Sequence, residues 1–142
     1  MKQLLTILLC LITLSAIGQN YELYSCNTIS RRMMIDNNWS TWDDLKVNNM
    51  IIRNCIRENR IEFNNVAQTK FYMIRELRRE RGIDKDGDKY LLITWTGYDQ
   101  NGLACNMISM DYTDLRNRNF MLEYADTQTL FMCEILNQNQ AI

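Results

Sequence analysis

Acidic side chains are the groups in this sequence that could perform acid–base chemistry, and they occur as two close pairs. Asp43 and Asp44 form one pair, and Asp111 and Asp114 form the other. Two carboxyl groups held about 5–9 Å apart can hydrolyse a glycosidic bond, one as the acid and the other as nucleophile or base. Both pairs flank predicted turns, where Asp is common for conformational reasons. We therefore name no catalytic residue and keep a small carboxylate-dependent hydrolase as an alternative function.

Histidine is absent from the chain, and this narrows the chemistry further. Ser-His-Asp triads, Cys-His nucleophiles and His-ligated metals all need an imidazole. Residues 84–88 (DKDGD) have the acidic character of a calcium loop, but an EF-hand loop needs Gly at its sixth position and Glu at its twelfth. Here Gly87 is fourth and Trp95 is twelfth. The segment predicts a hairpin turn, with weak calcium binding as the alternative, and we predict no metal site and no cofactor.

Two further segments have side chains that could bind a ligand at the surface. Residues 39–42 (WSTW) place Trp39 and Trp42 three positions apart. We interpret them as aromatics covering one end of the fold, and the alternative is an exposed platform for a sugar or a peptide. Residues 75–82 (RELRRERG) mix Arg with Glu, which is typical of a solvated face. The alternative for this segment is a patch that holds an anionic ligand through guanidinium groups.

The N-terminus has the pattern of an export signal. Lys2 precedes an apolar run over residues 4–14, and Ala16 and Gly18 offer small residues for signal peptidase. The run is shorter than the roughly 20 residues that span a bilayer as a helix. We therefore predict a cleavable signal peptide at residues 1–18 and a single domain at 19–142. Removing Lys2 lowers 16 basic residues to 15 against 17 acidic ones, and this balance gives no general attraction to nucleic acid.

Four cysteines remain after the predicted cleavage: Cys26, Cys55, Cys105 and Cys133. They are far apart in the sequence, so no CxxC redox or zinc motif is present. An even number of cysteines in an exported chain favours two disulfides, and all three pairings stay open. The alternative is four buried free thiols, because cysteine also packs well as a small hydrophobic residue.

Short apolar and aromatic segments, separated by Asn, Asp and Gly, determine the predicted fold. Residues 90–98 (YLLITWTGY) are the most strand-like, and the Asn101–Gly102 pair that follows is typical of a tight hairpin. Connections this short cannot contain crossover helices, so neighbouring strands should pair antiparallel. We predict a mainly β domain, in which an antiparallel meander closes into a small barrel or a two-sheet sandwich. Residues 66–81 also fit one short helix, although strand is favoured because like charges recur at helical spacing.

A barrel of this size could enclose a small apolar ligand, as lipocalin-like and avidin-like folds do. We predict that four aromatic side chains line such an interior: Trp95, Phe120, Tyr124 and Phe131. With Trp39 and Trp42 they are the candidate ligand-binding residues.

The assembled pattern resembles small secreted bacterial proteins of the Bacteroidota type that have no characterised activity. The likeness lies in the signal end SAIGQ, in WSTW, and in ITWTGYDQNGLACNMISM, where a turn separates an aromatic strand from a Cys-bearing one. The resemblance implies export and a β-rich fold, and it implies no activity, cofactor or catalytic residue. In the related pattern a second Cys can occupy the position of Gly97, so Cys105 lacks that partner across the hairpin here.

The expected function follows from these observations. We predict a non-enzymatic exported β domain that acts by binding a protein or a small molecule in the periplasm, at the cell surface or outside the cell. The alternatives are the apolar-ligand barrel and the carboxylate-dependent hydrolase. No nucleic-acid partner is expected, and no transmembrane segment is expected after signal cleavage.

Overall fold

The computed structural model describes residues 21–112 and 116–137. The predicted signal peptide, residues 1–18, lies outside the described residues, as does Asp114. Among the described residues no helix is long and apolar enough to cross a membrane. The described elements are β1 (Tyr21–Ile35), β2 (Asn38–Trp39), β3 (Lys46–Cys55), the 3-10 turn η1 (Ile56–Glu58), β4 (Arg60–Asn64), β5 (Thr69–Ile83), β6 (Lys89–Asp99), β7 (Ala104–Tyr112), β8 (Asn117–Glu123) and β9 (Thr127–Asn137).

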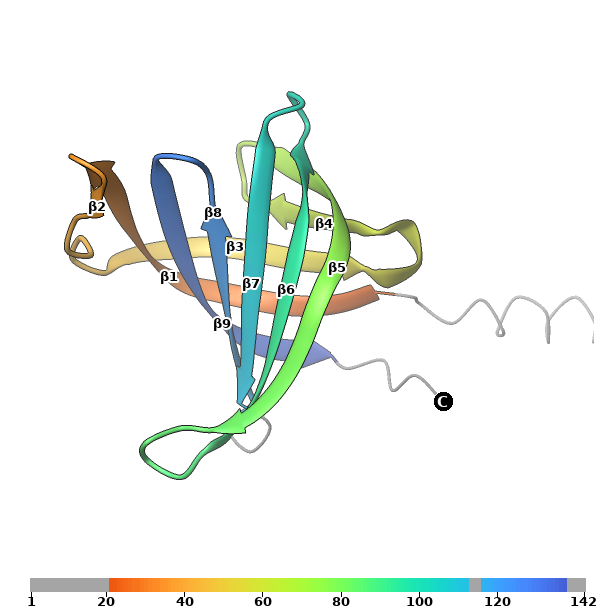
Figure 1. The fold of residues 1–142 in the computed structure, drawn as a ribbon. Helices are drawn as coiled ribbons and strands as arrows, with labels where there is room; N and C mark the ends of the chain where they lie inside the picture. The colour runs from red at the N-terminus through yellow and green to blue at the C-terminus, as the bar shows by residue number, and fades with distance from the viewer. Residues whose placement is uncertain (1–20, 113–115, 138–142) are drawn as a thin grey trace, which may run out of the picture.

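Eight of these strands close into an antiparallel barrel (Figure 1). Strands β3 to β9 form a meander in which each strand pairs with the next, because their short connections can only return the chain to a neighbouring antiparallel position. Strand β1 pairs with β3 on one side and with β9 on the other, which closes the barrel. Strand β2 adds two residues to the far end of β1. The predicted mainly β meander and its closure into a barrel are confirmed, and the two-sheet sandwich is not the fold.

The segment that also fitted a helix is a strand. Strand β5 pairs with β6 from Tyr72 to Ile83. Burial along β5 has the period of two that a strand requires, since Tyr72 and Ile74 are buried while Phe71 and Met73 are exposed. The helix alternative is wrong because this alternation allows β5 to bury one face in the barrel, whereas a helix there would bring like charges together.

The hairpins on either side of β6 use the same turn chemistry. Asp84 Oδ1 accepts the backbone N–H groups two and four positions ahead, both at 2.9 Å. Asp99 Oδ1 does the same at 2.8 and 2.9 Å. Gly87 lies three residues after Asp84, and Gly102 lies three residues after Asp99. Their φ angles are 90° and 82°, values that residues with a side chain rarely adopt. Both predicted hairpin turns are confirmed. Within the described chain, no group of three or more Cys, Asp or Glu side chains is arranged to hold a metal ion.

Inward-facing side chains fill the middle of the barrel. Five large ones are fully buried, each from a different strand: Tyr24, Ile52, Ile61, Met107 and Phe120. The rings of Tyr24 and Phe120 meet edge to face, with their centroids 5.2 Å apart. Burying one such side chain contributes about 1.5–3 kcal/mol to folding. This buried layer supports the walls of the barrel and leaves room near its two ends.

Gly97 allows β5 and β6 to approach closely. A Cβ at this position would lie 1.8 Å from the carbonyl oxygen of Met73 on β5, so no side chain fits without displacing backbone. Gly97 lies opposite Cys105 across the β6–β7 hairpin, as the sequence suggested. The cysteine that the related pattern can place at position 97 is therefore incompatible with this backbone.

Candidate functional site

The first candidate site is a cavity of about 360 Å³ at the end of the barrel where the β4–β5, β6–β7 and β8–β9 connections lie. Phe63 and Phe131 are buried and meet edge to face at 4.8 Å, and Tyr72 packs on Phe63 at 5.1 Å. We call this space the aromatic cavity; its other apolar lining residues are Ile29, Met50 and Leu122. Its volume falls in the range of about 300–1,000 Å³ that is common for small-molecule sites.

Two tyrosine hydroxyls and the nearby Asp99 carboxylate supply polar groups at the aromatic cavity, and each has one protonation state near neutral pH. The Tyr124 hydroxyl donates a hydrogen bond to Asp99 Oδ2 at 3.0 Å. Burial raises the pKa of Tyr124 and of Tyr72 above the ordinary value for tyrosine, so both hydroxyls stay protonated near neutral pH. The backbone N–H groups of Leu103 and Asn101 lower the pKa of Asp99, so this carboxyl stays ionised. Tyr124 is therefore held in one orientation at the wall of the cavity.

Positive charge gathers at the rim of the aromatic cavity. Arg31 and Lys70 both line it and are exposed to solvent, whereas its described lining includes no Asp or Glu. Asp99 lies behind Tyr124 and already accepts hydrogen bonds from the backbone. Asp43 and Asp44 line a smaller separate pocket that also involves Arg31. The lining of this cavity therefore combines an apolar aromatic floor with two cations.

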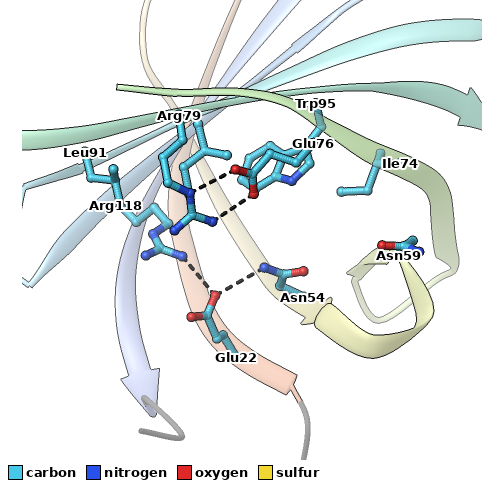
Figure 2. Close-up of a pocket in the computed structure, with 10 residues that line it drawn as sticks. Glu22, Asn54, Asn59, Ile74, Glu76, Arg79, Leu91, Trp95 and Arg118 are labelled. Carbon is cyan, nitrogen blue, oxygen red and sulfur yellow. Dashed lines mark hydrogen bonds and ion pairs between the residues drawn. The ribbon is translucent and has the colours of Figure 1, made fainter. Parts of the chain in front are cut away.

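The second candidate site is a cavity of about 270 Å³ near the opposite end of the barrel, and it contains charged groups (Figure 2). We call it the ionic cavity. Arg118 is only 6% exposed, and its Nη1 lies 3.0 Å from Glu22 Oε2. The same guanidinium pairs through Nη2 with the buried Asp111 and donates to the Tyr24 hydroxyl. Asn54 donates a further hydrogen bond to Glu22 Oε2 at 3.2 Å. Arg118 is thus shared between two carboxylates.

A β-bulge places a second ion pair at this cavity. Glu76 lies opposite Trp95 and Arg79 lies opposite Ile93, with a shift of register between Glu76 and Arg78. In a regular strand, side chains three positions apart would point to opposite faces, but one inserted residue brings both to the same face. Arg79 donates to both oxygens of Glu76, at 2.9 and 2.8 Å (Figure 2). This hydrogen bonding lowers the pKa of Glu76, which therefore stays ionised.

In the described part of the chain, the carboxylates at the barrel cavities are paired with arginines rather than free for acid–base chemistry. Asp43 and Asp44 lie outside the two barrel cavities, and Asp111 is held by Arg118. Glu76 is likewise held by Arg79, and its pKa is lowered rather than raised. A general acid for glycoside hydrolysis needs a raised pKa so that it is protonated near neutral pH. The geometry of the described residues therefore favours binding over paired-carboxylate catalysis.

The structure distributes the predicted ligand-binding residues over several places. Tyr124 and Phe131 line the aromatic cavity, Trp95 lines the ionic cavity, and Phe120 lies in the buried layer. The two cavities share no lining residue, so the four aromatics do not surround one common interior. Trp39 and Trp42 pack on the Arg32 guanidinium, with centroids 5.4 and 4.5 Å from its Cζ. Trp39 also lines, together with Tyr124, a more open pocket of about 440 Å³. The two tryptophan rings stabilise the β1–β2 corner, and a role in ligand binding stays a prediction for all six residues.

Sequence reasoning overlooked the charged residues of the barrel interior. Arg118, Phe120 and Leu122 alternate along β8, and all three are buried. Because alternate residues of a strand point to the same face, the spacing of Arg118 from Phe120 and Leu122 indicated that its charge points into the barrel. Glu76 and Arg79 lie in segment 75–82, which the sequence indicated as a solvated face or an anion-binding patch. No glycine or proline marks the bulge that turns both side chains toward the cavity.

No protein-family model matches the chain, and comparisons with curated proteins and with solved structures give no match either. The cavities and the residues that line them are therefore the features from which a function can be inferred.

All four cysteines of the described chain are buried free thiols, so the two expected disulfides are not present. Cys26 and Cys133 face each other across the β1–β9 seam that closes the barrel. Cys55 lies opposite Tyr21 and Arg60, and Cys105 lies opposite Gly97. Cys55 and Cys105 are on β3 and β7, which are not neighbours in the barrel. The four cysteines are therefore buried free thiols, which was the alternative expectation. Of the possible disulfide partners, only Cys26 and Cys133 lie at facing positions on neighbouring strands.

Alkaline pH is expected to remove stability through Cys105. Burial raises the pKa of this thiol from 9.0 to about 11, so the unfolded chain loses the proton first as pH rises. The contribution is fully present below pH 9.0 and is lost as pH approaches about 11. We expect Cys105→Ala to show a smaller fall in the free energy of unfolding across this interval than the parent protein, measured by urea denaturation. Equal falls for both proteins would contradict this assignment.

Proposed function

We propose that this chain is an exported, non-enzymatic barrel that binds a small apolar molecule carrying an anionic group in the aromatic cavity. The observation that carries the proposal is the combination of an aromatic floor with two rim cations and no lining carboxylate. Phe63 and Phe131 supply apolar surface, while Arg31 and Lys70 supply positive charge. A ligand that is apolar at one end and anionic at the other matches both parts.

The binding energy would come from two sources. Removing apolar surface from water contributes about 25 cal/mol for each Å² buried. A carboxylate or sulfonate at the rim can form charge-assisted hydrogen bonds with Arg31 or Lys70, which are stronger than neutral ones. The Tyr124 hydroxyl and the amides of Asn65 and Gln68 add polar groups near the same opening. Such a division between apolar floor and polar rim is typical of small-ligand sites.

Export enters the proposal through the N-terminal pattern and the resemblance to secreted Bacteroidota-type proteins. Residues 1–18 have the charge, apolar length and small residues of a cleavable signal. In that compartment the barrel would meet small molecules outside the cytoplasm. N-terminal sequencing of protein recovered from a periplasmic fraction or the medium tests this part, and a chain retaining residues 1–18 would contradict it.

The ligand class can be tested with three decyl probes that differ only in their head group. The fluorescent dye 1-anilinonaphthalene-8-sulfonate, itself an apolar anion, serves as the reporter for the aromatic cavity. We expect decanoate to displace the dye at least about tenfold better than decan-1-ol or decyltrimethylammonium, which corresponds to about 1.4 kcal/mol. All probes are used below their micelle concentration. Equal displacement by decanoate and decyltrimethylammonium, or no dye binding, would contradict the proposal.

A double variant assigns this binding to the proposed site. Arg31→Gln with Lys70→Gln removes both rim cations, and both side chains are exposed, so folding should be preserved. We expect decanoate to lose about tenfold in affinity while decan-1-ol is unchanged. The matched control is Arg78→Gln with Lys85→Gln, which removes the same charges from exposed positions outside the aromatic cavity. An equal loss in both double variants would show that only net charge matters.

A further inference from the structure

We propose that the ionic cavity is a second binding site, which takes a small organic amine in its protonated form. This site is separate from the aromatic cavity and would select the opposite charge. Glu22 and Glu76 line the cavity together with Arg79 and Arg118, and Asp111, which does not line it, joins the same charged network through Arg118. Three negative and two positive charges leave one negative charge in excess. An ammonium group is the ligand chemistry that neutralises this excess.

The arginines of the network are already engaged, so they are poorly placed to attract an anion. Arg118 is held between Glu22 and Asp111 and also donates to Tyr24. Arg79 donates two hydrogen bonds to the carboxylate of Glu76. An anionic ligand would have to displace a carboxylate from one of them. A cation instead can approach Glu22 or Glu76 without breaking either ion pair.

The burial of Arg118 also points to a function. Buried ion pairs are often no more stabilising than apolar residues of the same volume, so they contribute little to stability alone. Here Arg118 is deeply buried between two carboxylates, whereas the Glu76–Arg79 pair at the same cavity is exposed to solvent. The cluster is therefore better explained as the polar side of a binding cavity.

The apolar side of the cavity defines the rest of the ligand. Trp95 and Ile74 are buried, and with Leu91 they line the cavity beside the carboxylates (Figure 2). An aromatic ring within about 6 Å of an ammonium group attracts it through the charge distribution of the ring. Asn54 and Asn59 add amide groups at the same opening. A compact apolar body bearing one ammonium group matches this lining and the volume of about 270 Å³.

The three tryptophans of the chain make a selective reporter available. Trp39 and Trp42 lie against Arg32, away from the ionic cavity, whereas Trp95 lines it. In a Trp39→Phe, Trp42→Phe background the fluorescence therefore comes from Trp95 alone. The probes are cyclohexylmethylamine, cyclohexylmethanol and cyclohexanecarboxylate, which share one ring and differ in the charge of the head group. We expect the amine to change the fluorescence of Trp95 in a saturable way. The alcohol should bind at least about tenfold more weakly, and the carboxylate should not bind.

Two carboxamide variants in this background assign the amine to the carboxylates. Glu76→Gln and Glu22→Gln each remove the excess negative charge while keeping side-chain shape, and each should weaken amine binding by about tenfold. Glu80→Gln is the matched control, because Glu80 lies on the same strand in an exposed ion pair with Arg78 and does not line the cavity. Circular dichroism and the unfolding midpoint verify that each variant is folded.

Several results would overturn the second site. These are tighter binding of the carboxylate than of the amine, unchanged amine affinity in both Glu76→Gln and Glu22→Gln, or no change of Trp95 fluorescence with any probe. The Arg31→Gln, Lys70→Gln variant separates the two proposals, since it should lower the affinity for decanoate and leave the affinity for the amine unchanged. Loss of amine binding in that variant would also contradict a separate site.

Discussion

Replacing Arg118 with methionine is expected to lower the free energy of unfolding by about 3–5 kcal/mol at neutral pH. The guanidinium is buried and pairs with both Glu22 and Asp111. Removing it leaves two carboxylates close together in the barrel without a cation, and each also loses a charge-assisted hydrogen bond. Methionine has a similar length and no charge, so the loss reports mainly the uncompensated carboxylates. Urea denaturation of the parent protein and of Arg118→Met at neutral pH measures the difference directly.

Two further variants complete the Arg118 experiment. Arg78→Met changes an exposed arginine paired with Glu80, and we expect it to alter stability by no more than about 0.5 kcal/mol. Adding Glu22→Gln and Asp111→Asn to Arg118→Met removes the orphaned charges and should restore part of the loss. If the triple variant were less stable than Arg118→Met alone, the buried carboxylates would not be the source of the effect.

Truncating Phe120 to alanine is expected to cost about 3–5 kcal/mol, the range for removing a large aromatic from a packed core. The side chain is fully buried and packs edge to face on Tyr24. It also lies opposite Phe131 on β9 and Ser109 on β7, so the cavity would open where three strands meet. Its neighbours Tyr24 and Phe131 lie on β1 and β9, the two strands whose pairing closes the barrel.

Thermal or urea unfolding measures this effect, and Phe71→Ala is the matched control. Phe71 is on β5 and is 41% exposed, so the same truncation there should cost no more than about 1 kcal/mol. Similar losses at Phe71 and Phe120 would contradict the assignment of Phe120 to the closed layer of the barrel.

The strand content of the fold was predictable because its signals are local. Residues 90–98 have the composition of a strand, and the Asp and Gly spacing on either side of it produces two turns with the same hydrogen bonds. Short connections then impose antiparallel neighbours, which made a closed meander one of only two expected architectures. The choice between barrel and sandwich depended on whether β1 pairs with β9. That pairing joins residues about a hundred positions apart and has no local signature.

The candidate sites were less predictable because cavities arise from the spacing between strands. Trp95, Phe120 and Phe131 are buried and Tyr124 is partly buried, yet the four belong to two cavities and a closed layer, and their role in ligand binding stays a prediction. Neither cavity could be assigned to one of them before the barrel was closed. The alternation around Arg118 was a usable signal, whereas the bulge that brings Glu76 and Arg79 to one face was not.

By itself, the sequence determined the alternation of buried and exposed residues, the positions of the hairpin turns and the absence of imidazole chemistry. These properties depend on side-chain type and on the period of two in a strand. The tertiary structure alone decided that β1 meets β9, that two carboxylates share Arg118, and that two separate cavities form with different linings. Such features depend on register and closure, which bring together side chains that no short stretch of chain contains.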